Sequence, residues 1–209
     1  STSRGLGDVY KRQVDNISHG RGAVYNNINA AITLQGGSYT RSQEASTGSD
    51  ASGSNSWYVL KNFGTMTIKD GVTVKFSDSN SGLYSSLIGN GWQNSSAAEA
   101  GSNGEPQPSA GGKQAKLTIN GGTFTGGSIT IKNDDGGKID KICGDAVITN
   151  ETQTAIQNTS TIGEISGGTI SGGGRAIYNS SWKDGAEEYI GTITIKDLSL
   201  IHISEPTRR

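Results

Sequence analysis

The chain has 209 residues, with 18 basic and 19 acidic side chains, a formal net charge of −1 and only 31% hydrophobic residues. This charge balance excludes a polyanion or an anionic membrane surface as the expected partner, and no apolar run reaches the length of a membrane span. With 32 glycines, the chain is also too poor in apolar side chains for an ordinary globular core, so any core must be thin and repetitive.

The two ends resemble one DNA segment translated from opposite strands. With Gln13 written as CAG, the reverse complement encodes Leu198, and the match continues residue by residue to Ser3 and Arg208. The segment is similar to a transposase-type sequencing adapter. Translated adapter of this kind does not belong to the native protein and does not specify its fold.

We therefore expect residues 1–13 and 198–209 to be translated adapter, and residues 14–197 to be a fragment of a longer reading frame. The ends hold five basic and two acidic residues, so 13 basic and 17 acidic residues remain, a net charge of −4. His19 is then the one remaining histidine.

The first repeated unit is AVYN at 23–26, which returns as AIQN at 155–158 and again as AIYN at 176–179. Its Asn is expected at a corner, because Asn tolerates the left-handed backbone region. Stacked Asn amides are expected to bond along the axis of the repeat.

The second unit joins paired glycines to a short strand, in LQGGSY at 34–39, INGGTFTGG at 119–127 and ISGGTISGG at 165–173. Glycine supplies positive φ and close backbone approach, so these pairs predict tight corners.

The third unit is GTMTIKD at 64–70, GSITIKN at 127–133 and GTITIKD at 191–197. It alternates strictly, so that Met66 and Ile68 face one side while the Thr and Lys side chains face the other. The three segments are almost equally spaced, and each interval corresponds to three turns of about 21 residues. The last two copies of the AVYN-type unit are one such turn apart.

Two low-complexity polar segments, at 41–56 and 94–114, predict solvated loops that interrupt the repeat. What remains predicts an all-β chain folded as a right-handed parallel β-helix, a single coil of about six or seven turns with strands stacked one turn above another. A β-sandwich is the competing architecture, but the short hairpin links that it needs are scarce here.

GRGAVYNN at 20–27, GGRAIYNSS at 173–181 and ISGGTISGG resemble the repeats of bacterial surface adhesin-like proteins with a pectate-lyase-like β-helix fold. A more distant similarity is to polymorphic outer-membrane adhesins, although their Phe-x-x-Asn motif is not evident. The resemblance implies an extracellular or cell-surface segment without catalysis, which binds carbohydrate or a host or cell-surface protein.

The alternative is a fragment of a carbohydrate-active β-helix enzyme, a polysaccharide lyase or glycoside hydrolase. Asp134 and Asp135 are adjacent, so on a strand they would point to opposite faces, and the glycines that follow predict a corner instead. With Asp140 they could supply calcium ligands, but solvated acids are favoured because no calcium-binding loop motif is present. His19 and Cys143 do not make a zinc site, and Cys143 is expected to be a small buried residue. We expect no catalytic residue, metal or cofactor.

Trp57, Trp92 and Trp182 lie at loop borders and are the candidate ligand-contact residues, since exposed aromatic rings stack on sugars or anchor a protein partner. The competing role for them is to cover loop bases. Ice binding is not expected, because Thr-x-Thr recurs only every third turn. Three or more acids, or an Arg/Lys pair, on one outer face would favour the enzyme, whereas a Thr/Ser/Asn-covered face would favour the adhesin.

Overall fold

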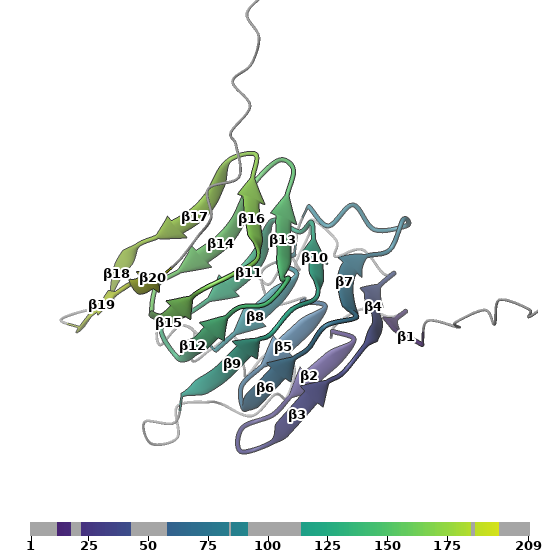
Figure 1. Cartoon of the computed structure of the whole chain (residues 1–209), viewed down its shortest axis with the longest axis horizontal. Helices are drawn as coiled ribbons and strands as arrows, with labels where there is room; N and C mark the ends of the chain where they lie inside the picture. Colours follow the sequence, from purple (N-terminus) through teal and green to yellow (C-terminus); the bar gives the residue numbers. More distant parts are fainter. Residues whose placement is uncertain are drawn as a thin grey trace, which may run out of the picture.

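The computed structural model describes residues 12–17, 22–42, 58–83, 85–91, 114–184 and 187–196. These residues form three six-stranded sheets and one hairpin, and no helix (Figure 1). Sheet A contains β1 (Gln13–Asn16), β4 (Gly37–Arg41), β7 (Val72–Phe76), β10 (Thr123–Thr125), β13 (Val147–Asn150) and β16 (Thr169–Gly172). Sheet B contains β2 (Val24–Asn26), β5 (Leu60–Asn62), β8 (Ile88–Asn90), β11 (Ile129–Asn133), β14 (Thr154–Asn158) and β17 (Arg175–Asn179). Sheet C contains β3 (Ala31–Leu34), β6 (Thr65–Ile68), β9 (Ala115–Ile119), β12 (Gly137–Ile142), β15 (Thr161–Ile165) and β20 (Thr192–Ile195). The hairpin is β18 (Ser181–Asp184) with β19 (Glu187–Ile190).

Successive strands pass from sheet A to B to C and then return to A, and every pair within the three sheets is parallel. The chain is therefore a right-handed parallel β-helix of six turns, as predicted, and Figure 1 shows the turns stacked from β1–β3 to β16–β20. Ile156 pairs with Ile177, which matches the predicted period, whereas Ile131 pairs with Ile156 across a longer turn. The predicted turn length thus lies at the short end of the range of turn lengths in this coil.

The core consists of columns of inward side chains in register. In sheet C, Met66, Leu117, Ile139 and Ile162 lie one above another and are at most 1% exposed. Burial of each such side chain stabilises the fold by about 1.5–3 kcal/mol. Columns of this kind need few apolar residues per turn, which reconciles the low hydrophobic content with a closed interior.

An asparagine ladder closes the corner between sheets B and C. Each Asn amide donates from Nδ2 to the Oδ1 of the Asn one turn on, at 2.7–2.8 Å, through Asn26, Asn62, Asn90, Asn133, Asn158 and Asn179. The predicted axial bonding of the Asn in AVYN, AIQN and AIYN is confirmed. The predicted left-handed backbone is wrong, because Asn29 is the one non-glycine residue with positive φ in the described part of the chain. Asn occupies this corner for its amide, which serves as both donor and acceptor.

Glycine forms the corner between sheets C and A, as predicted. Gly37 and Gly168 have φ of 97° and 84°. A Cβ on Gly168 would lie 2.3 Å from the carbonyl oxygen of Ala146 in the neighbouring turn, so this corner combines positive φ with close backbone approach.

The equivalence proposed for the third unit is wrong in part. The segments at 64–70 and 191–197 do form strands of sheet C, β6 and β20, but 127–133 forms β11 of sheet B. Loop insertions alter the length of chain between turns, so the equal spacing of the three segments does not identify the sheet. Asn133, at the end of this segment, belongs to the ladder instead.

Candidate functional site

The outer face of sheet A carries two rows of hydroxyl groups. We name this surface the hydroxyl face and define it by Thr73, Thr123, Thr125, Thr149, Thr169 and Ser171. Thr123, Thr125, Thr169 and Ser171 are exposed and the other two are half-buried. The rows follow from alternation, because the residues between them, such as Phe124 and Ile148, point into the core.

The geometry of a sheet fixes the spacing of these hydroxyls. Neighbouring strands lie about 4.8 Å apart, and alternate residues along a strand are roughly 6.6 Å apart. Hydroxyl pairs occupy β10 and β16, two turns apart, so they recur more closely than the three-turn spacing expected for Thr-x-Thr. Lys75 and Val147 interrupt the rows, so the lattice of hydroxyls is not continuous.

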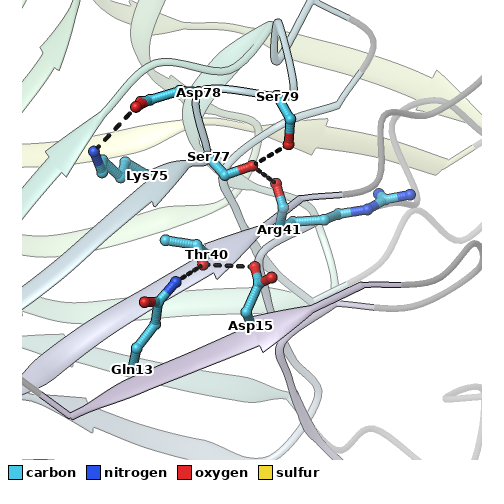
Figure 2. Close-up of polar contacts among 8 residues, drawn as sticks. All are labelled: Gln13, Asp15, Thr40, Arg41, Lys75, Ser77, Asp78 and Ser79. Atoms are coloured by element: carbon cyan, nitrogen blue, oxygen red, sulfur yellow. Dashed lines mark hydrogen bonds and ion pairs between the residues drawn. The ribbon is translucent and has the colours of Figure 1, made fainter.

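A polar cluster joins the first three strands of sheet A (Figure 2). Gln13 Nε2 donates to Thr40 Oγ1 at 3.0 Å, and that hydroxyl donates to Asp15 Oδ1 at 2.6 Å. One turn on, Ser77 Oγ donates to the carbonyl oxygen of Arg41 at 3.2 Å. The cluster binds successive turns to each other. Thr40 is only 2% exposed, so its hydroxyl is not presented to a ligand.

The outer face of sheet C carries charged side chains that bind one another. Glu164 accepts from Lys141 at 2.8 Å and from Lys196 at 3.0 Å. Hydrogen bonds from Lys141, Ser166 and Lys196 lower the pKa of Glu164 to about 2. The same Glu164 contact raises the pKa of Lys141 above its usual value. Glu164 is therefore ionised at neutral pH and holds no proton to donate to a leaving group.

The predicted corner at Asp134 and Asp135 is confirmed, because both lie between β11 and β12. The expectation that these acids are solvated is wrong for Asp134, which is 3% exposed and lies 3.4 Å from Lys132 Nζ. Asp140 is bound to Lys138 at 2.7 Å. Across the described ranges, no three His, Cys, Asp or Glu side chains gather in a way that could hold a metal ion.

Two of the three candidate aromatic residues, Trp57 and Trp92, lie outside the described residues, as does His19. Trp182 is in β18, where it pairs with Tyr189 of β19 in the hairpin between β17 and β20 (Figure 1). The hairpin was not predicted, although the DG in WKDGAEEYI is a hairpin signal.

Cys143 is half-buried at the corner after β12, with Sγ 3.3 Å from Asn120 Oδ1. The expectation that Cys143 is a small buried residue is wrong, because this side chain is only half-buried at the corner.

A groove of about 520 Å³ lies beside the first rungs of the ladder. Its aromatic member, Phe63, is only 6% exposed, and the ring packs edge-on against Tyr25 with centroids 5.4 Å apart. This ring therefore offers no open face on which a sugar could stack. The rest of the groove is of mixed polarity and includes Ile28, Asn29, Thr65, Gln114 and Lys116.

Comparison of the chain with protein-family models, with curated proteins and with solved structures found no match. The fold and the surfaces above thus carry the functional argument. A search of the described residues for a helix with the length and hydrophobicity to cross a membrane found none.

Proposed function

We propose that this chain is a structural and binding segment of a secreted or cell-surface bacterial adhesin-like protein, and that it binds carbohydrate through the hydroxyl face without catalysis. The observation that carries the proposal is the outer face of sheet A, where four turns contribute hydroxyls in register and only Lys75 and Val147 interrupt the rows. The location and the bacterial source rest on the sequence resemblance alone.

The chemistry of the hydroxyl face suits a polyhydroxylated ligand. Each Thr or Ser hydroxyl both donates and accepts, as sugar hydroxyls do, and β10 and β16 each present a pair of hydroxyls at alternate residues. The strands beneath are held by the packed columns and the asparagine ladder, so ligand binding orders few side chains. A preorganised array of this kind favours an extended chain of sugar residues over a single monosaccharide.

The second candidate function is a fragment of a polysaccharide lyase or glycoside hydrolase. The observation that favours it is the pair Lys141 and Lys196 on one outer face. Both ammonium groups bind Glu164, however, and the low pKa of that carboxyl removes it as a general acid. The binding function therefore has the stronger support.

The test compares two double variants on glycan arrays. Thr125→Val with Thr149→Val removes two hydroxyls of the hydroxyl face but keeps the side-chain shape. Thr67→Val with Thr118→Val removes an equivalent in-register pair from sheet C and is the matched control. Two lost hydrogen bonds predict about a tenfold weaker affinity for the first variant and an unchanged affinity for the second.

Two results would contradict this proposal. Equal loss of affinity in both variants, or retention of no glycan by the unaltered chain, would remove the hydroxyl face as a binding surface. Release of unsaturated or reducing sugars from polygalacturonate or mixed glycans would establish the enzyme instead.

A further inference from the structure

The groove beside the first rungs of the ladder is built by a corner that is longer than the corner of the next turn. Residues 27–30 join β2 to β3, whereas residues 63–64 join β5 to β6. The longer corner is braced by its own hydrogen bonds, from the Ile28 amide to Asn27 Oδ1 at 2.7 Å and from the Ala30 amide to the Asn27 carbonyl oxygen at 3.0 Å. It therefore gives the groove a fixed wall.

Gly64 lets this wall lie close to the second turn. A Cβ on Gly64 would lie 2.2 Å from the Ala30 carbonyl oxygen, and that oxygen accepts from the Thr65 amide at 2.9 Å. The third turn adds Lys116 to the lining, and the Lys116 amide donates to the Gly64 carbonyl oxygen at 2.8 Å. Backbone bonds thus hold the parts of the groove in place, so ligand binding would order little of the chain.

The groove carries an unmatched positive charge. Lys116 is the one charged side chain among the described residues that line it, and this side chain is exposed. Within the described part of the chain, no carboxylate forms an ion pair with Lys116, whereas its in-register neighbour Lys138 is bound to Asp140 at 2.7 Å. Two ammonium groups on adjacent strands repel each other, so an anion bound beside Lys116 would be stabilised.

The rest of the lining suits a sugar ring. Thr65 presents an exposed hydroxyl, which both donates and accepts hydrogen bonds. Ala30 and Ala31 present exposed methyl groups, and the half-buried Ile28 adds further apolar surface for the C–H groups of a ring. The volume of about 520 Å³ lies within the range of about 300–1,000 Å³ that is typical of small-ligand sites.

We propose that this groove binds an acidic sugar residue, with the carboxylate on Lys116 and ring hydroxyls on Thr65. A neutral sugar would leave the charge of Lys116 unmatched, whereas a carboxylate forms a charge-assisted hydrogen bond with it. The ligand is a ring with one carboxylate, because the described lining holds one cation. The groove borders sheet C, not the hydroxyl face of sheet A, so this site is independent of the binding function proposed above.

The test titrates the full chain with glucuronate, glucose and acetate and follows backbone amide shifts by nuclear magnetic resonance. Glucuronate should give saturable shifts at Gly64, Thr65 and Lys116. Glucose should bind about tenfold more weakly or not at all, because it lacks the carboxylate.

Two substitutions of Lys116 and one matched control isolate the charge. Lys116→Met keeps the aliphatic stem but removes the ammonium group, so it should weaken glucuronate binding about tenfold, whereas Lys116→Arg should retain it. Lys69→Met removes another exposed lysine, at the corner between β6 and β7, and should leave the affinity unchanged. Thr125→Val with Thr149→Val should also leave it unchanged, so failure of this site and failure of the hydroxyl face are seen separately.

Four results would overturn the proposal. These are the absence of saturable shifts at the groove with glucuronate, equal affinity for glucose and glucuronate, and equal losses for Lys116→Met and Lys69→Met. The fourth is acetate that binds as tightly as glucuronate, since the site would then recognise a carboxylate alone and not a sugar acid.

Discussion

Replacement of Asn133 by Ala in the middle of the ladder should destabilise the fold more than any substitution at an exposed rung. Asn133 is fully buried. Its Oδ1 accepts from Asn90 at 2.8 Å, and its Nδ2 donates to Asn158 at 2.7 Å and to the Thr161 carbonyl oxygen at 3.2 Å. The substitution removes all three bonds at once.

The magnitude follows from what is left behind. Asn90 retains a buried donor without a partner, which costs about 1–3 kcal/mol, whereas Asn158 Oδ1 still accepts from the Ser160 amide. With about 1 kcal/mol for each of the other two lost bonds, the free energy of unfolding should fall by about 3–5 kcal/mol. That is a large share of the roughly 5–15 kcal/mol typical of a folded domain.

The assay is urea unfolding followed by circular dichroism, with Asn179→Ala as the matched control. Asn179 makes the equivalent bonds at the exposed last rung, where water replaces the lost partner, so its substitution should cost about 1 kcal/mol. Equal losses for the two variants, or a loss below about 1 kcal/mol at Asn133, would refute the claim that the ladder stabilises the buried corner.

Three further predictions follow from the structure. Gly168→Ala should lower the free energy of unfolding by more than Gly126→Ala. Both residues have positive φ, but only a Cβ on residue 168 would meet a backbone atom, the Ala146 carbonyl oxygen at 2.3 Å. Comparable melting temperatures for the two variants would contradict this. Ile139→Ala should cost about 2–5 kcal/mol in urea unfolding, because it opens a cavity in a fully buried column, and a cost below about 1 kcal/mol would mean that the column is not packed. The pKa of Glu164 is lower in the folded state than in the unfolded state, so the contribution of Glu164 to stability should be complete above about pH 4.5 and be lost as the pH falls towards 2. Glu164→Gln should remove that part of the pH dependence of the free energy of unfolding. An identical pH profile for the variant would contradict this prediction.

Local patterns predicted the scaffold of this protein because they specify backbone geometry over a few residues, which does not depend on the number of residues in each turn. Alternation identified inward residues such as Met66, paired glycines identified the corners, and AIYN identified the ladder at Asn179. Ile195 is half-exposed despite its inward position only because it lies in the last turn.

The surfaces were harder to predict because they depend on which strands become neighbours. Thr73 pairs with Thr123, and Thr123 pairs with Val147 after a much shorter length of chain, so no fixed period reveals the hydroxyl face. Asp134 has the sequence context of a solvated turn and lies only two residues after Lys132, but the burial of both side chains depends on the tertiary fold.

The parallel pairing of β10, β13 and β16 is the relation on which both the fold and the hydroxyl face depend, and nuclear Overhauser contacts between backbone protons measure it directly. We expect contacts of the parallel type between the segments around Phe124 and Ile148, and between those around Ile148 and Ile170. Antiparallel contacts between strands adjacent in the sequence, such as β10 with β11, would contradict it.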